Sequence, residues 1–441
     1  MYTSSRSIVL MVLLVATLAG HTAAAAEKAW EVYGRDDGMV GDEVISMDLS
    51  DGVLWVATTW SDPNATEPEL EGGVSTVKAG NRSFTTYRPN DGLAHKKVWV
   101  TLIDGDRVWF GTFDGLSMLD TDKLAELGTF DVKEAWTTFT FKLEDKQIAK
   151  DIYSLALQGD TLWFGSNLGL GSMNTDSYEW VHYGVEDGLP GKKVQAIAED
   201  GNLIWAGTDQ GLARFDREKE EFTVIDIPSK ATGGDVVTAL AADDESVWVG
   251  TRAGLHAMNK ATEQWTPYAD EIPGSFVQEI AVRDGEVWIG TIDGVGIYDK
   301  EKDKWKVMDE GDGLASNDVR EIRFQGEDYI WIGTAKGLVR HYPAAVFGQI
   351  IQIIIIAVVV ALIGIAIVVA KIKFFTPSPE EIERRQKVKE IRQKRKEKSK
   401  KGKPPWEVCG GQPKKELCSR CKYNSVKAGK LHCSKYNIDL E

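Results

Sequence analysis

The stretch VQEIAVRDGEVWIGTIDGVGIYD, residues 277–299, decides the fold of this chain. Apolar and polar side chains alternate along it, which is the period of a half-buried β-strand. The pairs Asp284-Gly285 and Asp293-Gly294 interrupt the alternation, and an Asp-Gly pair suits the tight turn of a hairpin. The stretch therefore predicts three short antiparallel strands. Gly290, two residues after Trp288, leaves room for a neighbouring sheet to approach.

The same unit recurs along residues 29–343, each time with a tryptophan at the centre of its second strand. These tryptophans are Trp55, Trp109, Trp163, Trp205, Trp248, Trp288 and Trp331. Their spacings are 54, 54, 42, 43, 40 and 43 residues, and a period of about 40–45 with several short strands is typical of propeller blades. The two long spacings indicate insertions at residues 61–73 and 121–135. Since a single blade cannot bury both of its faces, the units predict an all-β, seven-bladed β-propeller.

An aromatic strand of the W-x-x-Y kind ends each unit, and the number of these strands predicts how the ring closes. Six of them follow their own units, at residues 84–87, 136–141, 180–183, 222–225, 265–268 and 305–308. The seventh, WEVY at residues 30–33, precedes the first unit. We therefore expect the N-terminal strand to pair with the last blade, at residues 337–342. The alternative, an open solenoid, gives no reason for the chain to begin with an isolated fourth strand.

Two apolar segments flank the repeats. Residues 1–26 combine Arg6, an apolar run and small residues before Ala26, which is typical of a cleaved signal peptide; an uncleaved anchor is the alternative. Residues 344–370 contain no charged residue, and at ~1.5 Å per residue they are long enough to cross a membrane. A buried core helix is the alternative, but this segment has no amphipathic face. We expect the propeller at residues 27–343 and a transmembrane helix at residues 344–370.

Charge predicts the orientation in the membrane. Residues 371–441 hold 21 Lys and Arg against 9 Asp and Glu, whereas residues 27–370 carry a formal net charge of −28. A basic flank directly after a membrane helix belongs on the cytoplasmic side. The sequence therefore predicts a single-pass protein of the cell membrane, with an extracytoplasmic propeller and a cytoplasmic tail.

The tail is predicted to have two parts. Residues 371–405 form a basic juxtamembrane linker, in which residues 379–400 can form a charged helix. This linker either contacts anionic lipid or serves as a solvated spacer. Because it lacks interleaved aromatic residues, no nucleic-acid partner is expected. Residues 406–441 form a module that contains all the cysteines of the chain.

The cysteines follow a C-x8-C-x2-C-x11-C pattern: Cys409, Cys418, Cys421 and Cys433. In a reducing compartment, four thiolates can surround one metal ion, whose binding would supply the folding energy of so short a segment. Zn²⁺ is the first expectation and a [4Fe–4S] cluster is the alternative, since four thiolates suit either. A third interpretation is free thiols or a redox-active Cys418/Cys421 pair. His432 could replace one thiolate.

Candidate ligand-binding residues lie just before or at the start of the innermost strands and in the turns between second and third strands. They are Lys97, Trp99, Asp151, Lys193, Asp209, Asp235, Arg252, Asp293 and Lys336. Together they would form a funnel of mixed charge that holds a glycan or another small polar ligand. The alternative is that they are solvated residues chosen because they suit tight turns.

The repeats resemble a known family. The unit W-x-G-T-x-x-G-L, preceded by a Tyr and an Asp-Gly-Leu as at Tyr87 with Asp91-Gly92-Leu93, is similar to the two-component regulator propeller repeats. The resemblance covers residues 29–343 and implies an extracytoplasmic sensor domain, often joined to a histidine kinase. About 70 residues follow the predicted membrane helix, which leaves no room for a kinase domain.

These observations predict a membrane-anchored sensor, receptor or adaptor. The propeller would bind a ligand or partner outside, and the four-cysteine module would relay the event or dock a protein inside. A non-signalling envelope scaffold is the alternative. An outer-face lyase or hydrolase is the third interpretation, but no catalytic constellation stands out in the sequence and an enzyme is not expected.

Overall fold

The computed structural model describes residues 30–61, 70–78, 82–128, 131–143, 146–228, 236–268, 270–342 and 377–400, three isolated positions (354, 358 and 361), and the backbone of residues 424–427, 430–433 and 438–440. The chain divides into two compact units, residues 1–349 and residues 350–441, which are described separately.

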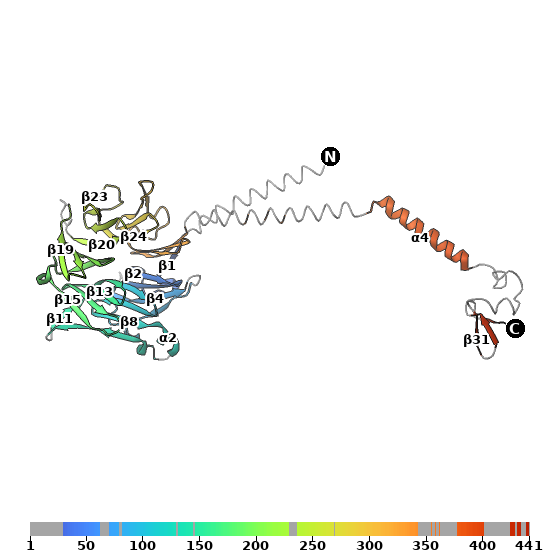
Figure 1. Ribbon diagram of the computed structural model, residues 1–441, viewed down its shortest axis with the longest axis horizontal. Helices are drawn as coiled ribbons and strands as arrows, with labels where there is room; N and C mark the ends of the chain where they lie inside the picture. Colours follow the sequence, from blue (N-terminus) through green and yellow to red (C-terminus); the bar gives the residue numbers. More distant parts are fainter. Residues whose placement is uncertain are drawn as a thin grey trace. The chain divides into compact units, whose positions relative to one another are not determined.

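The first unit contains seven four-stranded antiparallel sheets within its described residues, which confirms the predicted seven-bladed propeller (Figure 1). The innermost strands are β2 (Glu43–Ser50), β6 (Val98–Asp104), β12 (Ile152–Gln158), β16 (Val194–Asp200), β20 (Val237–Ala242), β24 (Val277–Arg283) and β28 (Val319–Gln325). The second strands are β3 (Val53–Ser61), β7 (Arg107–Thr112), β13 (Thr161–Ser166), β17 (Leu203–Thr208), β21 (Ser246–Thr251), β25 (Glu286–Thr291) and β29 (Tyr329–Thr334).

The third strands are β4 (Leu70–Lys78), β8 (Gly115–Asp120), β14 (Leu170–Asn174), β18 (Gly211–Asp216), β22 (Gly254–Asn259), β26 (Gly294–Asp299) and β30 (Gly337–His341). The outermost strands are β5 (Thr85–Tyr87), β9 (Trp136–Phe139), β15 (Trp180–Tyr183), β19 (Glu221–Ile225), β23 (Trp265–Pro267), β27 (Lys304–Met308) and, from the start of the chain, β1 (Trp30–Tyr33). The innermost strands contact one another in chain order, and β28 contacts β2 to complete the ring.

Apolar contacts between blades hold the ring together. The buried apolar side chains of the described residues gather in seven clusters, and each cluster joins two neighbouring blades. In the first of them, Trp55 of β3 packs with Phe110 of β7 and Trp136 of β9. The recurring tryptophan is therefore an interblade core residue, because each sheet buries its faces only against its neighbours.

The Asp-Gly-Leu motif connects one blade to the next. The Asp91 carboxylate accepts a hydrogen bond from the Arg88 N–H (2.8 Å), which fixes the turn of η3 (Pro89–Asp91). Gly92 has a φ of +123°, and a Cβ there would lie 2.6 Å from Cγ of Trp136 in the next blade. Leu93 is buried in the same interface. The equivalent carboxylates at Asp37, Asp187 and Asp312 accept the same backbone bond. These carboxylates therefore have a structural role in the turns between blades.

Strand β1 closes the ring, as the strand count predicts. It pairs antiparallel with β30 in the register Trp30 with His341 through Tyr33 with Leu338. In Figure 1, the β1 label lies against the orange strands of the last blade. The indole of Trp30 stacks on the His341 ring with 3.9 Å between centroids.

A partly buried ion pair lies across this closing pair of strands. Glu31 of β1 pairs with Arg340 of β30, and the Tyr33 hydroxyl donates to the same carboxylate (2.7 Å). Burial acts to raise the pKa of Glu31, but hydrogen bonds from Tyr33 and Arg340 outweigh it and lower the pKa to about 2. The Arg340 guanidinium also lies 5.4 Å from the ring centroid of Trp331. Polar and apolar contacts therefore both hold the first strand to the last blade.

The insertions differ in detail from the sequence prediction. Part of residues 61–73 extends the β3–β4 hairpin, since Ser61 pairs with Leu70. The second insertion contains α2 (Thr121–Leu127) and η4 (Val132–Ala135). An additional hairpin, β10 (Phe141–Leu143) with β11 (Lys146–Ala149), lies between the second and third blades and was not predicted. The outer strand expected at residues 136–141 therefore ends at Phe139. The remaining short helices η2 (Arg35–Asp37) and η5 (Val185–Asp187) lie in interblade turns.

The second unit contains α4 (Pro379–Lys400), which matches the predicted charged helix. Two ion pairs at i,i+4 spacing, Glu381–Arg385 and Glu383–Lys387, support it. A small sheet follows, with β32 (Lys430–Cys433) between β31 (Asn424–Lys427) and β33 (Ile438–Leu440).

The predicted signal peptide (residues 1–26) lies outside the described residues, as does the predicted transmembrane helix (residues 344–370) apart from its three isolated positions. Among the helices that the structure does describe, none combines the length and the apolarity that a membrane crossing requires.

We predict that Glu31→Gln destabilises the propeller by about 1–2 kcal/mol at pH 7, because Arg340 loses its charged partner. The folded-state pKa of about 2 lies below the reference value of 4.5, so the carboxylate contributes fully above pH 4.5. This contribution is lost as the pH falls from about 4.5 towards 2, and wild type and variant should then converge. Urea unfolding at several pH values measures the difference.

Glu263→Gln is the matched control, because Glu263 forms an exposed ion pair with Arg214 (3.3 Å) away from the closing strands. It should unfold like wild type throughout. A Glu31→Gln protein that also unfolds like wild type at pH 7 would contradict the role given to this ion pair.

Candidate functional site

A β-bulge lies at the start of every innermost strand. In each blade the register to the second strand shifts after the first paired residue, or after the second in the first blade, and leaves one residue without a partner in the ladder. The bulged residues are Ile45, Trp99, Tyr153, Gln195, Thr238, Gln278 and Arg320. A bulge re-aims its side chain, so these seven form a ring at the end of the central channel where the innermost strands begin. We call this end the channel mouth.

On one side of the channel mouth, polar contacts to the next blade occupy the bulged side chains. Gln278 donates to the Asp318 carboxylate (2.7 Å), and Arg320 donates to Glu43 (2.7 Å). Burial acts to raise the pKa of Asp318, but hydrogen bonds from Arg320 and Gln278 lower it. Thr238 donates to the Val277 carbonyl. These residues satisfy one another and hold the fifth, sixth, seventh and first blades together.

The other side of the channel mouth is not satisfied in this way. The rings of Trp99 and Tyr153 are in contact, with 5.5 Å between centroids. Among the described residues, Trp99 Nε1, Asp151 Oδ1 and Gln195 Nε2 are buried but have no hydrogen-bond partner. A buried polar atom without a partner costs about 1–3 kcal/mol. Other buried atoms without a partner, such as Trp109 Nε1 and Trp163 Nε1, lie in the interblade core, whereas these three lie together in neighbouring blades at the channel mouth, where a ligand or water can reach them.

Charged side chains surround these atoms. Lys97 Nζ lies 4.0 Å from the centroid of the Trp99 ring, and Lys193 Nζ lies 4.2 Å from that of Tyr153. Burial lowers the pKa of Lys193, and the nearby Arg252 lowers it further. Asp151 and Asp209 act on Lys193 in the opposite direction.

Burial and the Asp151 carboxylate raise the pKa of Tyr153 to about 12. We refer to these residues together as the open arc: Lys97, Trp99, Asp151, Tyr153, Lys193, Gln195, Asp209 and Arg252.

Six of the nine residues proposed from the sequence lie in the open arc: Lys97, Trp99, Asp151, Lys193, Asp209 and Arg252. Asp293 does not join them. It occupies the second central position of its turn, with its N–H directed to Thr291 Oγ1 (3.1 Å), whereas Asp209 and Arg252 occupy the first. Asp235 lies outside the described residues, and the residue directly before β20 is Val236.

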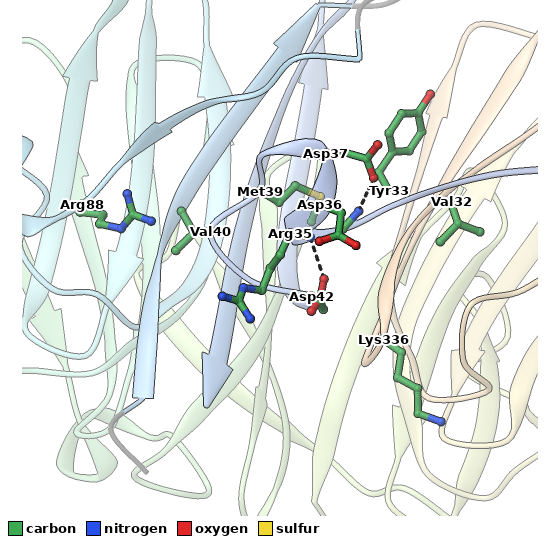
Figure 2. Close-up of a pocket in the computed structure, with 11 residues that line it drawn as sticks. Val32, Tyr33, Arg35, Asp36, Asp37, Met39, Val40, Asp42, Arg88 and Lys336 are labelled. Atoms are coloured by element: carbon green, nitrogen blue, oxygen red, sulfur yellow. Dashed lines mark hydrogen bonds between the residues drawn. The ribbon is translucent and has the colours of Figure 1, made fainter. Parts of the chain in front are cut away.

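Lys336 lines a separate cavity of about 460 Å³ beside the closing strand (Figure 2). Two carboxylates of this cavity already serve the backbone. Asp37 accepts from the Gly34 N–H (3.0 Å) and Asp42 from the Arg35 N–H (2.8 Å). This cavity is therefore a weaker candidate than the open arc.

Sequence reasoning missed Tyr153 and Gln195. Both lie two residues after a proposed residue, Asp151 and Lys193 respectively, and Trp99 stands in the same relation to Lys97. This two-residue spacing was the signal in the sequence that could have identified Tyr153 and Gln195. The bulge that turns these side chains to the channel mouth leaves no mark in the alternation of polar and apolar residues.

Further along the innermost strands, the channel wall is acidic. Arg323 of β28 pairs with Glu279 (2.6 Å) and Glu321 (2.8 Å), and Asp48 lies 3.7 Å away. Burial raises the pKa of Glu321 well above its usual value. One guanidinium thus faces three carboxylates below the channel mouth.

The structure does not describe the predicted metal site. Cys409, Cys418 and Cys421 lie outside the described residues, and Cys433 is described only as the last residue of β32. Within the parts of the chain that are described, no group of three or more His, Cys, Asp or Glu residues is arranged to hold a metal ion.

Comparison with known proteins shows that solved structures of different functions share the propeller fold. No protein-family model matches the sequence, and no curated protein matches it. The extracellular domain described as that of the hybrid two component system BT3049 from B. thetaiotaomicron has a similar structure, with a TM-score of 0.57 and 20% identity over 71% of this chain. That of the one component system BT4673 has a TM-score of 0.54 and 21% identity over 70% of this chain.

The chain spans only 41% and 40% of the lengths of these two domains. A streptogramin B lyase is also similar, with a TM-score of 0.53 and 13% identity over 70% of this chain and 96% of its own. At these identities the likeness shows the fold alone.

We predict that Arg252→Gln raises the pKa of Lys193, because a neighbouring positive charge that disfavours the protonated amine is removed. NMR titration of ¹³C-methylated lysines measures this shift. Arg214→Gln, which removes a guanidinium from β18 on the same blade as Lys193, should leave the Lys193 titration unchanged. An unchanged Lys193 in Arg252→Gln would show that the two cations do not share one site.

Proposed function

We propose that this chain is an extracytoplasmic binding propeller that acts as a sensor, receptor or adaptor, with the open arc as its ligand-binding site. The observation that carries the proposal is the set of buried, unpartnered polar atoms on Trp99, Asp151 and Gln195. Natural proteins rarely leave such atoms without partners unless a ligand, an ion or water supplies them.

The chemistry of the open arc suits a polar or glycan-like ligand. The Trp99 and Tyr153 rings offer an apolar face, and the surrounding charges and amide group can fix the ligand's orientation through hydrogen bonds. The two sides of the channel mouth differ, because Thr238, Gln278 and Arg320 already donate hydrogen bonds to the next blade. A ligand would therefore bind off-centre, against the second to fifth blades.

Binding is favoured over catalysis by the residues of the open arc rather than by the fold. The structural neighbours include both sensor domains and a lyase, so the propeller architecture does not decide between these functions. The open arc supplies cations, aromatic faces and hydrogen-bond donors, which are the components of a binding surface.

For the residues that follow the propeller, the proposal rests on the amino-acid sequence alone. Residues 344–370 would anchor the propeller in the membrane, with the basic linker on the cytoplasmic side. The four cysteines would hold Zn²⁺ or, alternatively, a [4Fe–4S] cluster in a module that docks a protein partner or relays the binding event. One membrane helix transmits a signal poorly as a monomer, so relay would involve an oligomer or a partner.

We predict that the triple variant Lys97→Ala/Lys193→Ala/Arg252→Ala binds its ligand at least ~100-fold more weakly than wild type, because charge-assisted hydrogen bonds are lost. A library of oligosaccharides and small polar metabolites, screened by thermal shift against the full chain, would supply the ligand. Titration calorimetry then compares the proteins.

Lys219→Ala/Lys302→Ala/Lys306→Ala removes the same number of positive charges from exposed positions outside the channel mouth and should bind like wild type. Ligand binding that the open-arc variant retains would move the site away from the channel mouth. A wild-type protein that binds nothing in the library would favour the scaffold alternative.

We predict that the full chain, purified anaerobically, carries one metal centre that Cys418→Ser/Cys421→Ser abolishes. Elemental analysis and the visible spectrum distinguish the two expectations. A colourless protein with zinc is expected for a structural module, and iron with absorbance near ~400 nm would identify an iron–sulfur cluster. Metal-free protein would contradict the four-thiolate site.

A further inference from the structure

The cations of the open arc lie against aromatic rings rather than in close ion pairs. Lys97 lies over Trp99, Lys193 over Tyr153, and the Arg252 guanidinium 5.7 Å from the Phe276 centroid. A ring face attracts a cation without cancelling its charge. Within the described residues, none of these three cations lies within ion-pair distance of a carboxylate.

The opposite side of the channel mouth shows the contrast. There, two carboxylates, Glu43 at 2.7 Å and Asp318 at 3.0 Å, neutralise Arg320. The charge of Arg320 is therefore neutralised within the protein, whereas the charges of Lys97, Lys193 and Arg252 can interact with a ligand. The crowding of Lys193 and Arg252, which helps to lower the pKa of Lys193, would be relieved by a negative group between them.

The unpartnered atoms also favour a ligand rich in acceptors. Trp99 Nε1 can only donate a hydrogen bond, and so can the Gln195 amide nitrogen; Asp151 Oδ1 can only accept. With the three cations, donors outnumber acceptors in the open arc. Asp209 is partly occupied, because its Oδ1 accepts from the Lys193 N–H (3.1 Å).

The positive open arc lies in a strongly acidic protein. Residues 27–370 carry a formal net charge of −28, and the channel wall beyond the mouth holds the three carboxylates around Arg323. The net negative charge of the protein would therefore repel an anion. The three cations of the open arc would stabilise it at the channel mouth.

We propose that the ligand of the open arc is an oxyanion, a molecule that carries a carboxylate or phosphate group on an acceptor-rich body such as a sugar. The anionic group lies between Lys193 and Arg252, and the body lies against the Trp99 and Tyr153 rings. This inference rests on the proposed function, since it names the class of ligand for the same site.

Three sugars and one simple anion test the charge requirement by calorimetry on the full chain. The sugars are glucose, glucuronate and glucose 6-phosphate, and the anion without a sugar body is inorganic phosphate. We expect at least one charged sugar to bind about tenfold or more tightly than glucose. Glucuronate and glucose 6-phosphate separate a carboxylate from a phosphate source. Inorganic phosphate shows whether the anionic group suffices.

Two variants locate the contacts. Lys193→Gln/Arg252→Gln should abolish the preference for the charged sugar over glucose. Trp99→Phe keeps a ring but removes the indole N–H, so it should weaken the binding of both glucose and the charged sugar. Lys219→Gln/Lys302→Gln is the matched control and should bind like wild type.

The outcomes separate the two proposals. Glucose binding as tight as that of the charged sugars, but sensitive to Trp99→Phe, would overturn the oxyanion inference and leave the open arc as the ligand site. Charged-sugar binding that survives both variants would contradict both proposals. No binding of either charged sugar up to about 10 mM would also contradict the oxyanion inference.

Discussion

The pairing of β1 with β30 is the constraint on which the rest of the structure depends. Each blade buries its faces only against its neighbours, so a row of blades would leave two apolar faces in water. Strand β1 supplies the outer strand of the last blade, and the chain then continues directly into β2 of the first blade. One strand thus ties both ends of the row together, and the Glu31–Arg340 pair holds it there.

Closure also makes the channel mouth. When the innermost strands form a ring, the bulge near the start of each strand directs one side chain to the same end of the channel. Four of these bulged residues, from Thr238 to Ile45, lie on the side where contacts between blades use the polar groups or where the side chain is apolar. Trp99 and Gln195 differ, because their side-chain nitrogens have no partner among the described residues, and cations lie over the rings of Trp99 and Tyr153. Of the seven equivalent bulged positions, four therefore lie on the side that serves the structure, and three lie on the side of the proposed ligand site.

The sequence predicted the blade number, the position of each tryptophan and the closing strand, because all three follow from a regular repeat of period-two strands. It also predicted six residues of the open arc. The prediction from sequence failed where a single residue changes the backbone geometry. The bulges, which bring Tyr153 and Gln195 to the channel mouth, leave the alternation unchanged. The offset of Asp293 was visible in the sequence, since Asp209 directly follows Thr208 whereas Asp293 is the second residue after Thr291. The β10–β11 hairpin was missed because β10 continues the alternation of apolar and polar residues from β9, with Phe139, Phe141 and Leu143 at every second position. The anchor and the four-cysteine module remain predictions.

Hydrogen–deuterium exchange of the closing strands tests the central claim most directly. If β1 completes the last blade, amides of β30 should exchange as slowly as those of the other third strands, such as β22 and β26, and those of β1 as slowly as other outer strands. The result that would contradict the account is fast exchange of β1, at the rate of an unstructured peptide, together with β30 exchanging like an open edge strand. In that case the ring is not closed by the N-terminal strand, and the channel mouth would not have the geometry on which the proposed function depends.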